Sequence, residues 1–355
     1  MLRRTALVAA VLALAAATAL PSSAAPAPSA LQRCSGDPTK VARTSLTVEG
    51  QPALALVALP KGRPRGIVVF DHGYGHTMES WREHASRTAR TLGVIAIAPN
   101  YRGQTVPPEG KQVSSRGWRV AEGAADTIAY AQHYERRCRP TGPNVVYGVS
   151  MGGNTSGLVL AARPKDDRGQ PLFDHWVDVE GAANVTETYL GARVLAPANE
   201  FAANAVADIQ EAFGGPLEAA PQTYAERTVV NRTDDIAASG VKGVVMVHGV
   251  ADGLVTYDIS RQLQALLRAR GVPVSFWSAV TRTPESEPGT TADGYLPTGQ
   301  TSPFAGHASE TSTTHVVGRA GFAALAQLYS GADFVCDEVV FDGMSGAEVG
   351  TSTPC

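Results

Sequence analysis

The residues of this chain that could do chemistry begin with a serine set between glycines, Gly148-Val149-Ser150-Met151-Gly152. In a G-x-S-x-G sequence the serine sits on a strained turn between a strand and a helix, which exposes its hydroxyl as a nucleophile. The glycines are needed because only a residue without a Cβ lets the flanking segments pass close together. The apolar run 144–147 predicts a buried strand before the serine, and the small apolar residues 151–163 predict a packed helix after it. Because G-x-S-x-G also arises by chance, its meaning depends on partners elsewhere in the chain.

The elements that must position this serine alternate between strands and helices, which is typical of a mostly parallel sheet with helices on both faces. Short apolar runs predict strands at 46–49, 53–58, 66–70, 94–98, 144–147, 175–179, 243–247 and 274–278. Helical patterns lie at 78–92, 117–134, 151–163, 257–270 and 314–329. A segment rich in Thr, Ser, Pro and Gly at 281–305 predicts a long surface loop. The fold class predicted is therefore α/β.

With the serine turn in this setting, the sequence resembles the α/β-hydrolase superfamily over nearly the whole mature chain. The resemblance implies an α/β-hydrolase fold with a mostly parallel central sheet flanked by helices. It also implies a helical cap insertion over the active site, at about 181–240. The domain predicted on this basis spans residues 28–355, with a disulfide-tied tail at 331–355.

The loop Asp71-His72-Gly73-Tyr74-Gly75-His76 directly follows the strand predicted at 66–70. Acyl transfer creates a tetrahedral oxyanion, which backbone N–H groups aimed at that oxygen stabilise. In the superfamily one donor is the residue after the nucleophile and the other comes from this loop. The resemblance therefore implies an oxyanion hole formed by the N–H groups of Met151 and Tyr74.

A candidate acid lies in the turn His248-Gly249-Val250-Ala251-Asp252, which follows the strand predicted at 243–247. A triad needs a carboxylate to hold the imidazole in one tautomer and to stabilise its protonated form. The turn looks like the acid turn of many α/β-hydrolases, which implies that Asp252 is this acid. Asp178 and Glu180, at the preceding strand, are the rival acids because some lipases place the acid there.

The superfamily order of the triad is serine, acid, histidine, and only His307 and His315 follow Asp252. His307 lies in a loop between the last predicted strand and the last helix, as the family pattern implies. His315 lies at the start of that helix. His307 is the predicted general base towards Ser150, and His315 is the alternative.

The amino terminus is predicted to be a signal peptide at residues 1–27, with a basic start, an apolar middle and a region of small residues. Cleavage after Ala25 and cleavage after Ala27 both fit this pattern. No other stretch could span a bilayer, so the mature protein is expected to be secreted without stable membrane insertion. In an oxidising compartment four cysteines argue for two disulfides. We favour the pairs Cys34–Cys138 and Cys336–Cys355, and no Cys-x-x-Cys indicates a metal or redox site.

The net charge of -3 and the lack of a Lys/Arg cluster argue against nucleic-acid binding. The sequence therefore predicts a secreted serine hydrolase that cleaves a small-molecule or polymeric carboxylic ester through an acyl-enzyme, without a cofactor or a metal. A peptidase or amidase of the same fold is the alternative, although its usual elbows carry an aromatic residue where Met151 stands. A non-catalytic secreted binding protein is the third possibility, because fold alone does not imply catalysis.

Overall fold

The computed structural model describes residues 34–250, 252–280, 307–308, 310–311, 315–342, 347–349 and 353–354. The predicted signal peptide at 1–27, the predicted loop at 281–305 and Cys355 lie outside the described residues.

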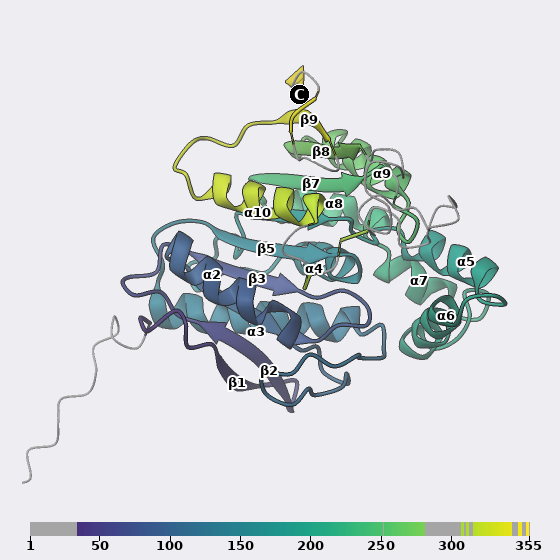
Figure 1. Ribbon diagram of the computed structural model, residues 1–355, viewed down its shortest axis with the longest axis horizontal. Coiled ribbons are helices and arrows are strands. Elements are labelled where there is room, and N and C mark those ends of the chain that lie inside the picture. The colour runs from purple at the N-terminus through teal and green to yellow at the C-terminus, as the bar shows by residue number, and fades with distance from the viewer. Residues whose placement is uncertain are drawn as a thin grey trace, which may run out of the picture.

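A ten-stranded sheet forms the centre of the molecule, in the order β1-β2-β4-β3-β5-β6-β7-β8-β9-β10 (Figure 1). The seven strands from β4 to β9 in this order run parallel, whereas β1, β2 and β10 pair antiparallel with their neighbours. The strands are β1 (Ala42–Val48), β2 (Gln51–Ala58), β3 (Ile67–Asp71), β4 (Ile95–Pro99), β5 (Asn144–Val149), β6 (His175–Val179), β7 (Gly243–Gly249), β8 (Val274–Val280), β9 (Asp337–Asp342) and β10 (Thr353–Pro354).

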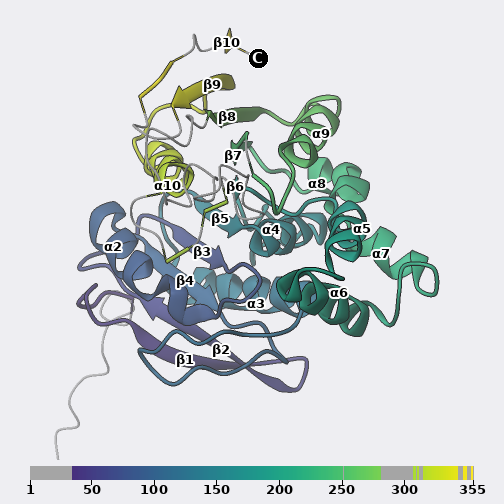
Figure 2. The same ribbon diagram turned by 45° about the vertical axis from the view of Figure 1, so that its right-hand side comes forward.

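The central strands are apolar throughout because helices cover both faces of the sheet. Successive residues of β3 show this, since Ile67 and Val69 belong to one core and Val68 and Phe70 to the other. Helices α2 and α10 lie on one face, and α3, α4 and α9 lie on the opposite face (Figure 2). A parallel sheet buried in this way holds the carboxyl ends of its parallel strands side by side at one end of the sheet.

The helices and short 3-10 segments fall into two groups, those that flank the sheet and those of the segment 181–240. The first group comprises η1 (Met78–Trp81), α2 (Arg82–Leu92), α3 (Val120–Cys138), α4 (Met151–Ala161), α9 (Tyr257–Arg268) and α10 (Val316–Leu328). The second comprises α5 (Val185–Leu195), α6 (Glu200–Phe213), α7 (Pro221–Arg227), η2 (Val229–Arg232) and α8 (Thr233–Ala238). In the part of the chain that the structure describes, no helix has the length and apolar character needed to cross a bilayer.

Helices α5, α6 and α7 form a layer beyond the edge of the sheet to which the arrowheads of β3 and β7 point (Figure 1). Their own small core contains Tyr189, Phe213 and Tyr224, with Tyr224 4.8 Å from Phe213 and 5.1 Å from Tyr189 between ring centroids. Helix α8 instead packs against α4 and α9 and so belongs to the layer on the sheet. We refer to α5, α6 and α7 below as the cap helices.

All eight predicted strands are present, but the sequence did not predict β9 or β10. The segment 331–355, expected to be only a tail, adds β9 to the sheet in parallel with β8. The reason is that β9 begins Asp337-Glu338 and is only partly buried, so it lacks the apolar run by which the interior strands were recognised.

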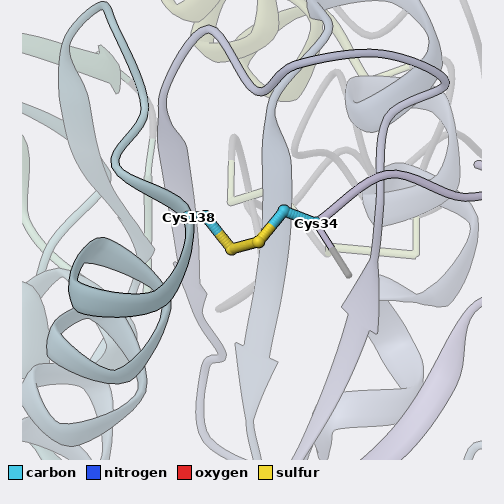
Figure 3. The surroundings of a disulfide bond; sticks show 2 residues. All are labelled: Cys34 and Cys138. Carbon is cyan, nitrogen blue, oxygen red and sulfur yellow. A yellow bond between two sulfur atoms is a disulfide. The ribbon is translucent and has the colours of Figure 1, made fainter. Parts of the chain in front are cut away.

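A disulfide joins Cys34 to Cys138, the last residue of α3, with 5.6 Å between their Cα atoms (Figure 3). This pairing is the one predicted for the first two cysteines. It attaches the start of the described chain to the end of the sheet where β5 begins. The predicted pair Cys336–Cys355 includes Cys355, which the structure does not describe.

Candidate active site

Ser150 occupies the turn between β5 and α4 with φ 57° and ψ −120°. This left-handed conformation is strained for a residue with a side chain, and such strain persists only where the surrounding structure enforces it. A Cβ on Gly148 would clash with the carbonyl oxygen of Gly152, and one on Gly152 would clash with that of Asp71. The two glycines therefore allow the close approach that the sequence predicted.

Hydrogen bonds hold this turn in place on both sides. The Ser150 N–H donates to the carbonyl oxygen of Val179 at 3.0 Å, and the Ala182 N–H donates to that of Ser150 at 2.9 Å. Met151 is the first residue of α4, and the N–H groups of a first helical turn have no partner within the helix. The Met151 N–H is thus a donor next to Ser150 without a partner inside α4.

Asp252 receives a hydrogen bond from a histidine and from two main-chain groups. Its Oδ2 is 2.6 Å from Nδ1 of His307, and its Oδ1 accepts the N–H groups of Leu254 at 2.8 Å and Val255 at 3.0 Å. His248 is also close, with Nε2 3.2 Å from Oδ2. Burial alone would raise the pKa of Asp252, but the charge and hydrogen bonds of His307 and His248 hold it well below its usual range.

Of the two candidate histidines, His307 is the one that the structure places at hydrogen-bond distance from Asp252. Burial would lower the pKa of His307, yet the Asp252 carboxylate, joined by Glu180 when that group is ionised, overcomes this and raises it to about 9. His315 precedes α10 as its N-cap residue. Burial there lowers the pKa of His315 to about 4, which keeps its imidazole neutral at pH 7.

The rival acids lie in different surroundings. Glu180 is buried beside the pair, with Oε2 3.7 Å from Nδ1 of His307 and 2.6 Å from the N–H of Ala308, which it accepts. Burial raises the pKa of Glu180 to about 8. The Asp178 carboxylate packs against Gly153 and Gly181 instead, and burial raises its pKa to about 7. Asp178 therefore lies apart from His307, whereas Glu180 contacts it.

The donor atoms of Glu180, Asp252 and His307 lie within 4.8 Å of one another, which is the one grouping in the described ranges with the spacing of metal ligands. Asp252 and His307 are hydrogen-bonded to each other, and the Ala308 N–H donates a hydrogen bond to Oε2 of Glu180. The hydrogen bond between Asp252 and His307 gives this pair the arrangement of a carboxylate-oriented imidazole.

A cavity of about 660 Å³ opens beside the serine and lies between the sheet edge and the cap helices. Ser150 and His307 both line it, and α5 and α6 supply much of its wall. Its apolar lining includes Trp118, Leu190, Val194, Leu195, Phe201 and Ile259. No Lys or Arg lines it among the described residues, whereas Glu187 and Glu310 do.

Tyr74, predicted to contribute an oxyanion donor, lines the same cavity. Its hydroxyl donates to Oδ2 of Asp208 on α6 at 2.5 Å, and Arg116 binds both oxygens of that carboxylate at 2.6 and 2.9 Å. His72 stacks on Tyr101 at 4.0 Å between ring centroids, and Tyr101 donates its hydroxyl to the His72 carbonyl. The loop 71–76 is thus held by α6 through Asp208 and by Tyr101 through His72.

Two residues of this site, Asp208 and Glu310, were not predicted from the sequence. Asp208 was one of several polar residues in the helical segment 181–240, and Glu310 lay in a loop without a motif. Their partners, Tyr74 and Gly73, are 134 and 237 residues away. No local pattern links residues so far apart.

Several solved structures share the overall fold of this chain. A puromycin-hydrolysing peptidase of Mycobacterium tuberculosis superposes with a TM-score of 0.52 at 19% identity, over 82% of this chain and 40% of that protein. An esterase of Pyrobaculum calidifontis gives 0.51 at 21% identity, over 68% of this chain and 75% of the esterase. A puromycin hydrolase gives 0.53 at 18% identity, over 88% of this chain and 41% of that protein.

The chain has the α/β-hydrolase fold. At these identities the likeness concerns the fold alone, and the chain spans only about two fifths of the length of the two puromycin-hydrolysing proteins. No protein-family model matches the chain. No curated protein matches it either.

Proposed function

We propose that this α/β-hydrolase is a serine hydrolase in which Ser150 is the nucleophile, His307 the general base and Asp252 the orienting acid. The observation that carries the proposal is that the strained Ser150 and the Asp252-bonded His307 line one cavity. A hydroxyl forced out of a strand–helix turn beside an oriented imidazole is the arrangement that activates a serine for attack on a carbonyl.

In the proposed reaction the Ser150 oxygen attacks the substrate carbonyl carbon while its proton passes to His307. Because Nδ1 of His307 is bonded to Asp252, the proton is taken up at Nε2. The carbonyl oxygen becomes an oxyanion that the N–H groups of Met151 and Tyr74 stabilise. When the intermediate collapses, His307 protonates the leaving group, and water then releases the acid from Ser150 by the same steps.

A neutral carboxylic ester is the substrate class that the cavity favours. Its lining is largely apolar, and its charged members among the described residues are two carboxylates and two histidines. An anionic acyl group would be repelled by Glu187 and Glu310 and would lack a guanidinium or ammonium partner. A neutral acyl chain buries apolar surface there instead.

Amide hydrolysis is the second candidate, because the solved structures of similar fold include peptidases as well as an esterase. A matched ester and anilide with the same neutral acyl group separates the two. We expect kcat/KM for the ester to exceed that for the anilide by at least about 100-fold. Equal kcat/KM values for the ester and the anilide would favour a peptidase. If neither substrate is hydrolysed, a non-catalytic binding protein is favoured.

We also propose that the mature protein is secreted after removal of residues 1–27. The Cys34–Cys138 disulfide supports this, because disulfides persist mainly in oxidising compartments. The amino-terminal sequence of the protein recovered from the medium of its native host tests it. Recovery only from the cytosol, with the first residues intact, would contradict it.

A further inference from the structure

Glu310 is a buried carboxylate beside the candidate nucleophile, three residues beyond His307 in the chain. It is 4% exposed and lines the same cavity as Ser150 and His307. A carboxylate so deeply buried is expensive to desolvate unless donors are aimed at it. The residues that donate to the Glu310 carboxylate therefore indicate which part of the site it positions.

Those partners are Gly73 and His76, which lie before and after Tyr74 in the loop 71–76, called the oxyanion loop below. The Gly73 N–H donates to Oε1 of Glu310, and Nε2 of His76 is 3.3 Å from Oε2. One carboxylate thus binds the loop both before and after the peptide unit that carries the Tyr74 N–H. Since that peptide unit lies between two fixed points, its rotation is restricted.

The packing around Gly73 shows how close this contact lies to Ser150. A Cβ on Gly73 would be 2.8 Å from Oε1 of Glu310 and 3.4 Å from Cβ of Ser150. The carboxylate and the nucleophile therefore flank the same small space.

We propose that Glu310 is a positioning residue that locks the oxyanion loop to the segment carrying His307. The proposal rests on the proposed function, since it assumes that the Tyr74 N–H receives the oxyanion. Its physical basis is that donors stabilise a transition state only if they are oriented before the reaction begins. A displacement of about 1 Å in such a group lowers the rate by about 100-fold. By joining the donor loop to the base loop, Glu310 fixes both relative to Ser150.

Two variants of nearly equal size separate the hydrogen bond from the bulk of the side chain. Glu310→Gln keeps an oxygen that accepts from Gly73, whereas Glu310→Met keeps the volume and loses the acceptor. Glu79→Met is the matched control, because Glu79 is also a buried, ion-paired glutamate but does not line the cavity. The readouts are the rate at which a fluorophosphonate labels Ser150, kcat and KM for a neutral ester, and Tm.

We expect Glu310→Met to slow labelling of Ser150 and to lower kcat by at least about 10-fold, because a donor to the transition state is displaced. KM should change by less than about threefold, because binding of the ground state does not depend on that donor. Glu310→Gln should keep at least about a third of the wild-type rate, and Glu79→Met should lower Tm without slowing labelling. Equal rates for Glu310→Met and wild type would overturn the proposal. So would an equal loss in Glu310→Gln and Glu310→Met, or a similar loss in Glu79→Met.

The wild type separates this proposal from the proposed function. Labelling of the wild type together with unimpaired Glu310→Met would remove the role of Glu310 alone, whereas an unreactive wild type would overturn both. Should Glu310→Met fail to fold, amide hydrogen exchange at Gly73 decides. Slow exchange in the wild type supports the lock, and exchange at the rate of a free loop contradicts it.

Discussion

Two carboxyl groups lie beside His307, and their surroundings give them opposite protonation states. Asp252 accepts two main-chain N–H groups as well as His307, which holds its pKa low and keeps it ionised. Glu180 has less compensation for its burial, so its pKa rises to about 8 and its carboxyl is protonated at pH 7. Only the ionised group can stabilise a protonated imidazole, so Asp252 is the orienting acid that we expect.

The choice of His307 over His315 is open to a direct comparison. We expect His307→Gln to lower kcat by about four orders of magnitude or more, because the serine loses its base. His315→Gln should change kcat by less than about threefold, since His315 is not among the described residues that line the cavity. Steady-state rates on an activated ester measure both, with Tm as the check on folding. The reverse pattern would assign the base to His315.

The pH dependence of kcat/KM follows from the charge on His307. Only the neutral imidazole can accept the serine proton, and Asp252 raises the His307 pKa to about 9 against the effect of burial. The activity is therefore expected to rise with pH, with its acidic limb above the ordinary histidine value of about 6.5.

In Asp252→Asn the acidic limb should move to lower pH, by at least about one unit, at a greatly reduced maximum rate. Glu180→Gln should move it less, because the Glu180 carboxyl is already neutral over most of this range. A wild-type limb at or below pH 6.5 would contradict the assignment of the Asp252–His307 pair.

At the scale of elements, α6 is tied to the oxyanion loop through Asp208, which binds both the Tyr74 hydroxyl and the Arg116 guanidinium. These hydrogen bonds connect α6, which lines the cavity, to the oxyanion loop. We expect Asp208→Ala to lower kcat/KM about 10-fold, because a charge-assisted hydrogen bond contributes about 1.5–3 kcal/mol.

Glu218→Ala is the matched control, since it removes a carboxylate of the segment 181–240 whose ion pair with Arg193 is exposed. An exposed pair of this kind contributes little, so this variant should stay within about twofold of the wild type. Equal effects of the two substitutions on kcat/KM for a neutral ester would mean that α6 does not hold the loop.

At the scale of the whole molecule, the sequence predicted what depends on neighbouring residues. The interior strands were recognisable because a parallel sheet buried on both faces needs unbroken apolar runs, and Ser150 and Asp252 stood in local motifs. β9 was missed because it is a partly buried strand with three acidic residues. Glu310 and Asp208 could not be predicted, because only the folded chain brings them to Gly73 and Tyr74.

The disulfide and the candidate site lie at opposite ends of β5. Cys138 precedes the amino end of this strand and Ser150 follows its carboxyl end, which separates them by about 20 Å. Replacing both Cys34 and Cys138 by Ser should lower the free energy of unfolding by about 2–5 kcal/mol, since the bridge closes a long loop. The value of kcat/KM at 25 °C should stay unchanged. Urea unfolding and steady-state rates test this, and a stable but inactive variant would contradict the separation.

The central claim is that Ser150 is an activated nucleophile, and the intact mass after treatment with a fluorophosphonate tests it most directly. We expect the wild type to gain the mass of one phosphonyl group and Ser150→Ala, folded to the same Tm, to gain none. A folded wild type that forms no adduct, or an adduct that persists in Ser150→Ala, would contradict the account.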